Sequence, residues 1–423
     1  MPPSAAPAVP TFAGVFPIDE VRPRFPALAR AAPFIYFDNA AGAQAPAGVL
    51  AAVASHLLDV NVQRGGRYAK SVEVDRVIDA ARAKVATFVG GDDPDEVAFG
   101  MNATSFMRLT SLALGQTLTP PRDEIIVTDL DHHANVATWL ELAKTGARIS
   151  WWRMREDHRL HVEDLTPLLS ERTRLVACTV VSHALGSRVD VAAVAKAAHA
   201  VGAEVFLDCV HYSPHAAIDV KAWDCDYLVC SGYKVFAPHM GFLWGKRAAL
   251  QRLPTFREEF IPDAPPHKLE AGTFIYENVA GMAAAIDYLA ALGADGDPAA
   301  RTPRARLLAA MAAIEAYEQG LSRAMLKALA GAGAQIYGVA NPNTVDLRVP
   351  TFCFSLPGVD PAAVATRMAA ADIGIRDGHM YAPRLMERLG LPLDSGAVRA
   401  SLVHYNTVGE IDRFAEVLRD LVP

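Results

Sequence analysis

Apolar residues recur along this chain in two rhythms, which predict two kinds of element. Short apolar runs predict buried strands, and these runs are Asp123–Asp129, Arg174–Ser182, Glu204–Cys209, Tyr227–Cys230 and Gly241–Trp244. Apolar residues spaced three or four apart predict helices, and these segments are Ala51–Leu58, Val72–Val89, Phe106–Leu114, His132–Leu142 and Asp190–Val201. Asp190 is placed to cap the last of these helices, and Gly202 is placed to end it.

Short apolar strands that alternate with amphipathic helices predict an α/β fold, with a mostly parallel sheet covered by helices on both faces. In such sheets, ligands bind outside the carboxyl ends of the strands. Three polar segments fall there: His132, Ser182–Gly186 and Asp208–His211. We therefore expect a ligand site built from these segments.

The pattern of predicted elements changes after a Pro-rich stretch near Pro262. Two long Ala-rich helices are predicted at Asn278–Leu292 and Pro303–Ala330, followed by an extended run at Thr351–Leu356 and a segment at Pro361–Ala371. This pattern predicts a second, smaller α/β domain. The expected organisation is an N-terminal arm over 1–34, a large domain over 35–290 and a small C-terminal domain over 291–423.

Net charge and composition argue against several classes of function. The formal net charge is -7 and no basic run occurs, which argues against a nucleic-acid partner. No uninterrupted apolar stretch is long enough to predict a membrane span, and the N-terminus lacks the pattern of a signal peptide. The five cysteines form no CxxC pair, so we expect reduced thiols, no zinc site or other metal site, and a cytoplasmic protein.

A lysine between two apolar strands is the first candidate for chemistry. Lys234 ends the segment Ser-Gly-Tyr-Lys (231–234), which separates two predicted strands. A charged, unpaired lysine is costly in such a place. Lys234 can extend to solvent as an ordinary loop lysine, or it can be a Schiff-base lysine whose amine is partly desolvated and therefore nucleophilic.

Three other segments become candidates for chemistry when they are considered together with Lys234. Asp208 ends a strand, where an aspartate is a turn residue or a partner for a protonated pyridine nitrogen. The segment 102–105 (Asn-Ala-Thr-Ser) opens a helix, and it is either a plain cap or an anion site. His132 is a surface or core histidine, or a planar ring that stacks on a cofactor.

Taken together, these segments resemble the class V aminotransferase family, and within it the cysteine desulfurases and selenocysteine lyases. The resemblance runs from about Tyr36 to the C-terminus. The matching segments, in chain order, are Tyr-Phe-Asp-Asn-Ala-Ala (36–41), Asn-Ala-Thr (102–104), Asp-His-His-Ala-Asn (131–135), Ser-His-Ala-Leu-Gly (182–186), Asp208, Ser-Gly-Tyr-Lys (231–234), Glu-Ala-Gly-Thr (270–273) and Arg-Ala-Ser-Leu-Val-His-Tyr-Asn-Thr (399–407).

The resemblance implies a fold type I enzyme that uses pyridoxal 5′-phosphate (PLP), acts on an amino acid and forms a homodimer with shared active sites. It assigns Lys234 as the cofactor lysine, Asp208 as the partner of the pyridine nitrogen, and Thr273 as a contribution from the other subunit. The cofactor-binding residues that it implies are Ala103, Thr104, His132, His183, Asp208, His211, Ser231, Tyr233, Lys234 and Thr273. The substrate-binding residues that it implies are Asn39, Arg376, His379 and Arg399, the last gripping the α-carboxylate.

The chain departs from the family in the loop that carries the desulfurase cysteine. That loop corresponds to residues 376–381, where Tyr381 takes the cysteine position, and no cysteine follows Gly374. Without a thiolate there is no persulfide acceptor. His183, His211 and Tyr233 stand where the family usually has Asn, Gln and His. These changes either preserve hydrogen bonding or add acid–base groups at the cofactor.

Several reactions remain open for such a chain. We expect Lys234, His132, Asp208 and Tyr381 to be the catalytic residues, and we favour β-elimination of a C–S or related bond, with Tyr381 or His379 protonating the leaving group. Transamination, epimerisation and hydrolytic cleavage of the kynureninase kind are alternatives. A protein that binds PLP without turnover is the remaining possibility, and an intact Lys234 and Arg399 argue against it.

Overall fold

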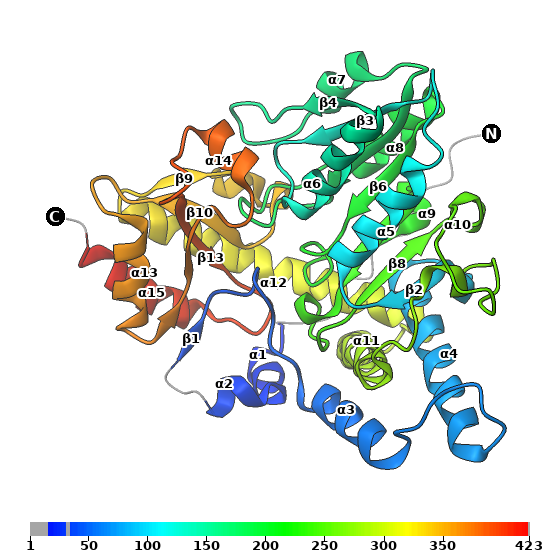
Figure 1. Cartoon of the computed structure of the whole chain (residues 1–423). Helices are drawn as coiled ribbons and strands as arrows, with labels where there is room; N and C mark the ends of the chain where they lie inside the picture. The colour runs from blue at the N-terminus through cyan, green and yellow to red at the C-terminus, as the bar shows by residue number, and fades with distance from the viewer. Residues whose placement is uncertain (1–15, 31–33, 422–423) are drawn as a thin grey trace, which may run out of the picture.

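A seven-stranded sheet forms the core of the larger part of the molecule in the computed structural model, which describes residues 16–30 and 34–421 (Figure 1). Its strand order is β2-β8-β7-β6-β5-β3-β4. The strands are β2 (Val97–Gly100), β3 (Glu124–Thr128), β4 (Arg148–Trp152), β5 (Thr173–Thr179), β6 (Glu204–Asp208), β7 (Tyr227–Ser231) and β8 (Gly241–Gly245). β8 runs antiparallel to β2 and β7, and the other neighbouring strands are parallel, so the predicted mostly parallel sheet is confirmed.

Two strands of this sheet have no counterpart among the predicted elements. β2 has only four residues and begins directly after a 3₁₀ turn. β4 is the half-buried edge strand Arg-Ile-Ser-Trp-Trp. β2 is too short and β4 too mixed in polarity to stand out from the local pattern, and their places are decided by pairing with β8 and β3.

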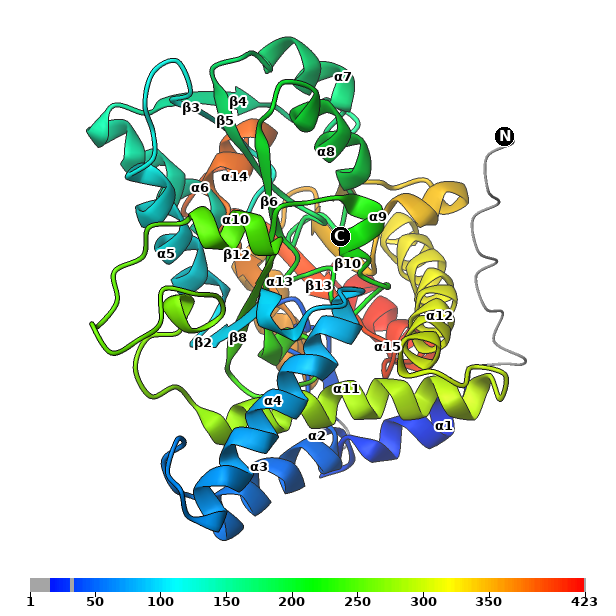
Figure 2. The same cartoon turned by 90° about the vertical axis from the view of Figure 1, so that its right-hand side faces the viewer.

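Helices cover both faces of the sheet, as predicted (Figure 2). One apolar cluster lies beneath α5 (Ala103–Gly115), α6 (Ala134–Leu140) and α10 (Arg247–Arg252). The other face packs on α4 (Ala69–Val89), α8 (Val191–Ala200) and α11 (Tyr276–Gly296). At α8 the Asp190 side chain accepts a hydrogen bond from the Ala193 amide at 3.0 Å, and Gly202 follows the helix with φ of 75°. The predicted cap and the predicted end of this helix are therefore both confirmed.

A second, smaller sheet follows in the C-terminal part. Its order is β12-β13-β10-β9, all antiparallel: β12 (Arg376–Gly378), β13 (Ala397–Ser401), β10 (Thr351–Ser355) and β9 (Gln335–Tyr337). It packs on α12 (Pro303–Gly331), α13 (Pro361–Ala369) and α15 (Val408–Arg419). The short helix α14 (Pro383–Leu389) lies between β12 and β13. The predicted smaller α/β unit therefore exists.

The first residues of the predicted large domain belong with this smaller sheet. β1 (Ile35–Tyr36) pairs in parallel with β11 (Ile373–Gly374), and Phe37 lies in the apolar cluster of the C-terminal part. The division at residues 35 and 290 remains a prediction. The remaining helices are α1 (Ile18–Val21), α2 (Pro26–Arg30), α3 (Ala47–Asp59), α7 (Val162–Leu165) and α9 (Val220–Trp223).

Part of the predicted N-terminal arm is packed against the core. Residues 1–15 and 31–33 lie outside the described residues. Between them, the Phe25 ring is fully buried and contacts Phe236 and Tyr288, and Arg22 forms an ion pair with Glu410 at 2.6 Å. Among the described residues, no helix combines the length and apolar character needed to span a bilayer.

Candidate active site

Lys234 lies between two central strands, as the sequence predicts. β7 ends at Ser231, a single 3₁₀ turn (Gly232–Lys234) follows, and β8 begins at Gly241. A Cβ atom at Gly232 would come within 2.8 Å of the Pro238 carbonyl oxygen, so the turn requires glycine. Burial lowers the pKa of Lys234 to about 8, and the Arg399 charge adds to this effect. A larger share of the amine is therefore neutral and nucleophilic near pH 7 than in an ordinary lysine.

Asp208 ends β6 on the same edge of the sheet. Its side chain is buried, and Oδ1 accepts a hydrogen bond from the Val210 amide at 3.0 Å. Burial raises the pKa of Asp208, while the Val210 amide and the Lys234 charge oppose the rise. A cationic ring nitrogen at this carboxylate would favour its ionised form.

Asp131 is a second buried carboxylate near Asp208, and the sequence reasoning missed it. The Asn135 amide donates to its Oδ1 at 2.7 Å, and the Thr128 hydroxyl donates to its Oδ2. Burial raises the pKa of Asp131 to about 7, and the Asp208 charge contributes. The available signal was the spacing of four between Asp131 and Asn135, which places both on one side of a helical turn.

The N-terminus of α5 points toward the same edge. Asn102 and Ser105 form a reciprocal capping box, and the Ala103 amide donates to Ser231 Oγ at 3.0 Å. A Cβ atom at Gly241 would lie 2.5 Å from the Asn102 backbone, so this glycine lets β8 approach the helix start. Free amides and hydroxyls at a helix N-terminus favour an anionic group such as a phosphate.

Three histidines meet at this edge. His132 and His183 have ring centroids 4.8 Å apart. His183 Nε2 donates to the Met380 carbonyl at 2.7 Å, and His211 Nε2 lies 2.8 Å from the Thr351 hydroxyl. Burial lowers the pKa of His132 to about 4 and holds the pKa values of His183 and His211 well below the ordinary range. All three rings are therefore neutral at physiological pH.

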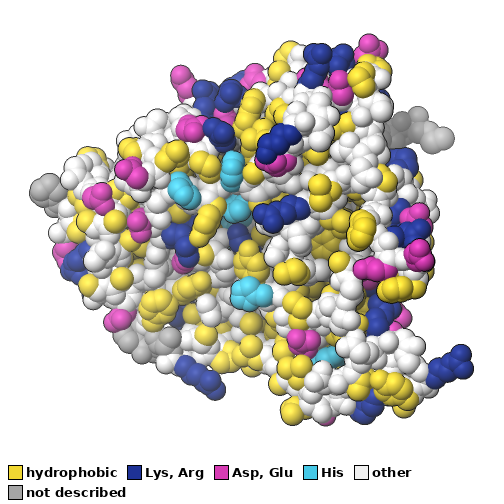
Figure 3. Space-filling model, viewed as in Figure 1, with side chains coloured by type: hydrophobic (Ala, Val, Ile, Leu, Met, Phe, Trp, Pro, Cys, Tyr) yellow, Lys and Arg dark blue, Asp and Glu magenta, His cyan; other side chains and the backbone are white. Residues whose placement is uncertain are grey.

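One cavity gathers nine of the ten predicted cofactor-binding residues. These are Ala103, Thr104, His132, His183, Asp208, His211, Ser231, Tyr233 and Lys234. The cavity is also lined by residues that the sequence did not single out, namely Met107, Ala134, Thr179 and Val210. Those side chains are small or apolar, so nothing in the sequence separates them from ordinary core residues. On the face seen in Figure 3, histidine side chains are visible near its centre, between α6 and α14.

Thr273 is the predicted cofactor residue that does not line this cavity. Its hydroxyl lies 3.3 Å from the Gln63 side chain, in a separate hollow on the surface. Its segment is held by the buried ion pair of Glu270 with Arg82, at 2.8 Å. The predicted contribution of Thr273 to a partner subunit remains a prediction.

Two of the four predicted substrate residues, Arg376 and Arg399, contact Asp38. The Arg399 guanidinium is buried and donates to the His183 carbonyl and to Asp38, each at 3.1 Å, while its Nε has no partner. Arg376 forms an ion pair with Asp38 at 2.7 Å. The Asn39 amide donates to Ser401 O at 2.8 Å and to Asn406 Oδ1 at 3.1 Å, and the Tyr405 hydroxyl donates to its Oδ1. Asn39 is thus already engaged within the protein, and its substrate role remains a prediction.

The loop after β12 closes against the histidines. The Met380 side chain is buried while Tyr381 is 58% exposed. Both residues have left-handed backbones, with φ of 53° and 58°. The His133 amide donates to the Tyr381 carbonyl at 2.8 Å, and the Tyr381 ring lies 5.9 Å from the His132 ring and from the His379 ring. The predicted catalytic Tyr381 therefore stands beside His132, and its chemical role remains a prediction.

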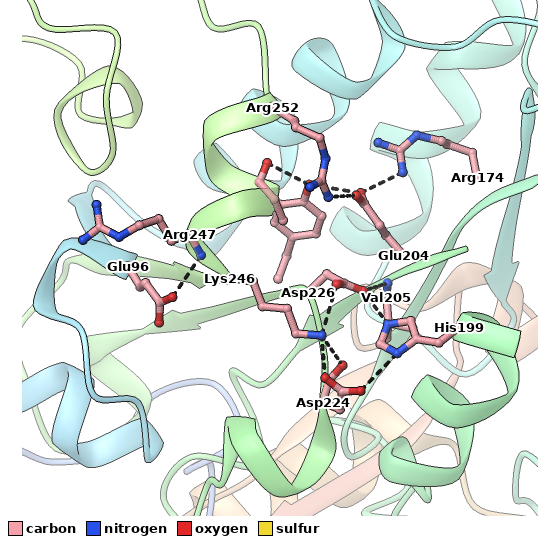
Figure 4. Close-up of polar contacts among 12 residues, drawn as sticks. Glu96, Arg174, His199, Glu204, Val205, Asp224, Asp226, Lys246, Arg247 and Arg252 are labelled. Atoms are coloured by element: carbon pink, nitrogen blue, oxygen red, sulfur yellow. Dashed lines mark hydrogen bonds and ion pairs between the residues drawn. The ribbon is translucent and has the colours of Figure 1, made fainter. Parts of the chain in front are cut away.

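A second group of ionisable side chains lies at the opposite edge of the sheet, where strands begin (Figure 4). Glu204 pairs with Arg174 and Arg252, each at 2.7 Å. Burial opposes ionisation of Glu204, but the two arginines outweigh it and hold its pKa below the usual value. His199 lies 2.9 Å from Asp226 and 3.2 Å from Asp224. These groups neutralise one another, which suits a structural network.

Comparisons with known proteins agree with this site. The model of the family "Aminotransferase class-V" matches residues 35–414. The chain is 34% identical to "Aminotransferase-like protein FGM3" of Gibberella zeae, over 95% of this chain and 98% of that protein. It is 32% identical to "Probable cysteine desulfurase" of Streptomyces coelicolor, over 96% of this chain and 97% of that protein.

Solved structures of cysteine desulfurases are similar to this chain in fold. The cysteine desulfurase CsdA of Escherichia coli has a TM-score of 0.82 at 27% identity, over 97% of this chain and all of that chain. The cysteine desulfurase of Thermococcus onnurineus NA1 has a TM-score of 0.85 at 26% identity, over 97% of this chain and 99% of that chain. The predicted fold type is therefore confirmed.

Proposed function

Because this chain belongs to the class V aminotransferase family of PLP-dependent enzymes, we propose that it cleaves a C–S or related β-bond of an amino-acid substrate by elimination, without a protein persulfide. The observation that carries this proposal is the loop after β12. It places the Tyr381 ring 5.9 Å from the cavity residue His132 and the His379 ring 5.9 Å from Tyr381, whereas all five cysteines of the chain are buried.

The residues of the cavity fit PLP. The start of α5 with Thr104 and Ser231 suits the phosphate, and Asp208 suits a protonated pyridine nitrogen. His211 Nδ1 is buried without a partner in the structure, as expected for an atom that a bound group satisfies. When bound, PLP supplies an electron sink for the bonds at the substrate α-carbon.

Proton transfer and substrate binding are assigned to side chains of this chain. Lys234 Nζ, with a pKa of about 8, takes up the proton from the substrate α-carbon. The buried guanidinium of Arg399 binds and orients the α-carboxylate. The phenol of Tyr381 or the imidazole of His379 donates a proton to the departing sulfur. The neutral His132 ring would pack against the bound cofactor without adding a charge there.

The cysteines are poorly suited to accept sulfur. Cys178, Cys209, Cys225, Cys230 and Cys353 are each fully buried. Burial raises the pKa of every one of these thiols. Since the thiolate is the nucleophile, a raised pKa and a fixed position both slow attack on a substrate sulfur.

We propose further that the enzyme is a cytoplasmic homodimer. Thr273 lies outside the cavity of its own chain, next to a hollow lined by Phe260, whose ring is 81% exposed. A second subunit over this hollow would cover Phe260 and bring Thr273 toward the partner's cofactor. Five unpaired thiols are typical of a reducing compartment.

Mass spectrometry after incubation with cysteine and S-substituted cysteines, without reductant, tests the reaction. We expect keto acid, ammonia and free thiol or sulfide, with the protein mass unchanged. Lys234→Ala should release none of these products and should lose the visible colour of the cofactor. The Tyr381→Cys variant serves as the positive control for a sulfur-accepting loop. An adduct of about 32 Da, the mass of one sulfur atom, on the unaltered protein during turnover would refute the proposal.

Transamination and epimerisation use the same lysine and the same electron sink. The panel distinguishes them, because transamination aminates an added keto acid and epimerisation inverts the α-carbon without releasing ammonia. A protein that only binds PLP would give no product with any amino acid.

A further inference from the structure

A buried acid–base pair lies behind the cofactor cavity and has no part in the proposed chemistry. His215 follows β6, and Glu318 lies on α12, 103 residues later in the chain. His215 Nδ1 is 2.7 Å from Glu318 Oε2, and the two side chains are 1% and 3% exposed. A carboxylate and an imidazole so far from water require a structural or functional reason.

Within the described part of the chain, no side chain other than His215 forms an ion pair with Glu318. Arg188 approaches from the segment before α8, but its guanidinium forms an ion pair with Glu315 at 2.6 Å. His404, from the segment after β13, is bonded to the Tyr288 hydroxyl at 2.7 Å. Lys234 and His211 face the pair from the cavity side. The Arg188 charge and the His404 backbone also act on Glu318, but its side-chain hydrogen bond is made to His215.

The pair is in contact with the cofactor cavity through one ring. The His211 and His215 centroids are 5.1 Å apart, with the rings nearly perpendicular. His211 lines the cavity, and its Nε2 is held by the Thr351 hydroxyl. His211 Nδ1, His215 Nε2 and Glu318 Oε1 are buried atoms without partners. These atoms require an explanation, because buried polar groups are nearly always satisfied.

We propose that Glu318 and His215 form a positioning pair that fixes the protonation state of His211 at the cofactor. Oε2 of the neutral Glu318 carboxyl accepts a hydrogen bond from His215 Nδ1, which leaves His215 Nε2 as an acceptor beside His211. His211 then carries its own proton on Nδ1, because Thr351 can donate to Nε2. The pair thereby keeps His211 neutral. The Nδ1–H group of His211 then faces the cavity.

The electrostatics agree with this geometry. Burial raises the pKa of Glu318 well above its ordinary value and holds the pKa of His215 well below its own. Glu318 therefore keeps its acid proton near neutral pH while the His215 imidazole stays neutral, so the unit has no net charge. A neutral unit can be buried without the cost of an isolated ion.

The test compares two carboxylates on one helix. Glu318→Gln keeps the shape and the hydrogen-bonding capacity but cannot exchange a proton. Glu315→Gln, three residues earlier on α12, is the matched control because Glu315 pairs with Arg188 instead. The readout is the pH midpoint of the visible absorbance of the bound cofactor, measured without substrate, so it does not depend on which reaction the enzyme catalyses.

We expect Glu318→Gln to shift this midpoint by about one pH unit, a tenfold change in the equilibrium. We expect Glu315→Gln to leave it within about 0.2 unit, as for a site that does not contact His211. His215→Gln should shift it as well, which covers the case in which Glu318→Gln does not fold.

His211→Gln tests whether the effect passes through His211. In that background, Glu318→Gln should cause no further shift, because glutamine does not titrate and contacting residues give non-additive effects. An unchanged midpoint in both Glu318→Gln and His215→Gln, with only thermal stability lowered, would show that the pair is purely structural and would overturn the proposal. A full shift that persists with His211→Gln would also overturn it.

Discussion

Individual ionisable residues in this protein owe their chemistry to burial as much as to their neighbours. Lys234 and Arg399 are both buried cations, and the Arg399 charge is one reason why the pKa of Lys234 falls to about 8. Asp38 offsets part of the Arg399 charge at 3.1 Å. A carboxylate ligand would meet Arg399 in a site from which water is largely excluded, where charge interactions are strong.

The Arg399→Gln variant should therefore bind its substrate much more weakly but keep its cofactor. We expect KM to rise by a factor that corresponds to about 2–5 kcal/mol, since the substrate carboxylate would be buried without a partner. Cofactor content should be normal by absorbance. The exposed Arg413 on α15 gives the control substitution, Arg413→Gln. An unchanged KM in Arg399→Gln would assign this arginine to structure alone.

Among the elements, the loop after β12 distinguishes this chain. Met380 and Tyr381 both adopt left-handed backbones, which cost about 1–2 kcal/mol for a residue other than glycine. The hydrogen bond from His183 to the Met380 carbonyl and the one from His133 to the Tyr381 carbonyl hold the loop in this form. These contacts suit a fixed closure more than a loop that travels.

His183→Asn should loosen this loop, because the shorter side chain does not reach the Met380 carbonyl. Loss of one buried hydrogen bond is worth about 1 kcal/mol. We therefore expect amide exchange over residues 379–382, and at the His133 amide, to accelerate about fivefold. His211→Asn is the matched control, since His211 bonds to Thr351 instead. Equal protection in both variants would mean that His183 does not hold the loop.

At the scale of the whole molecule, an aromatic cluster around His404 joins distant parts of the chain. His404 follows β13, and its ring contacts Phe25 of the N-terminal segment and Tyr288 of α11. Phe236, two residues after Lys234, packs on the same ring at 4.7 Å. His404 is fully buried, and burial lowers its pKa to about 3.

Because of this low pKa, the buried His404 makes the folded protein less stable at acidic pH. An unfolded chain binds a proton at histidine below about pH 6.5, whereas the folded protein does not. The stability that His404 contributes is therefore complete above pH 6.5 and is lost as pH falls toward its folded pKa of about 3. Between pH 7 and pH 5 the loss is about 2 kcal/mol for this one group.

Urea denaturation of the wild type and of His404→Gln at both pH values isolates this contribution. The gap in unfolding free energy between the two proteins should shrink by about 2 kcal/mol on going from pH 7 to pH 5, because glutamine does not titrate. The exposed His379 provides the control substitution, His379→Gln. A gap that stays constant would show that His404 is not kept neutral by the fold.

The local sequence determined the parts of this protein that depend on neighbours along the chain. Helical spacing and short apolar runs located α4, α8 and the central strands, because each element buries one face or both faces wherever it packs. The strand–lysine–strand order placed Lys234, and the strand-end positions placed His132 and Asp208 at the carboxyl edge of one parallel sheet.

Only the tertiary structure decided contacts between segments that are remote in sequence. The pairing of His215 with Glu318, the hydrogen bond from His183 to Met380, and the engagement of Asn39 by Ser401 each join segments more than 100 residues apart. The same holds for the edge strand β4, whose register depends on β3. Hydrogen bonding and burial of charge depend on distance in space, and spacing along the chain does not record that distance.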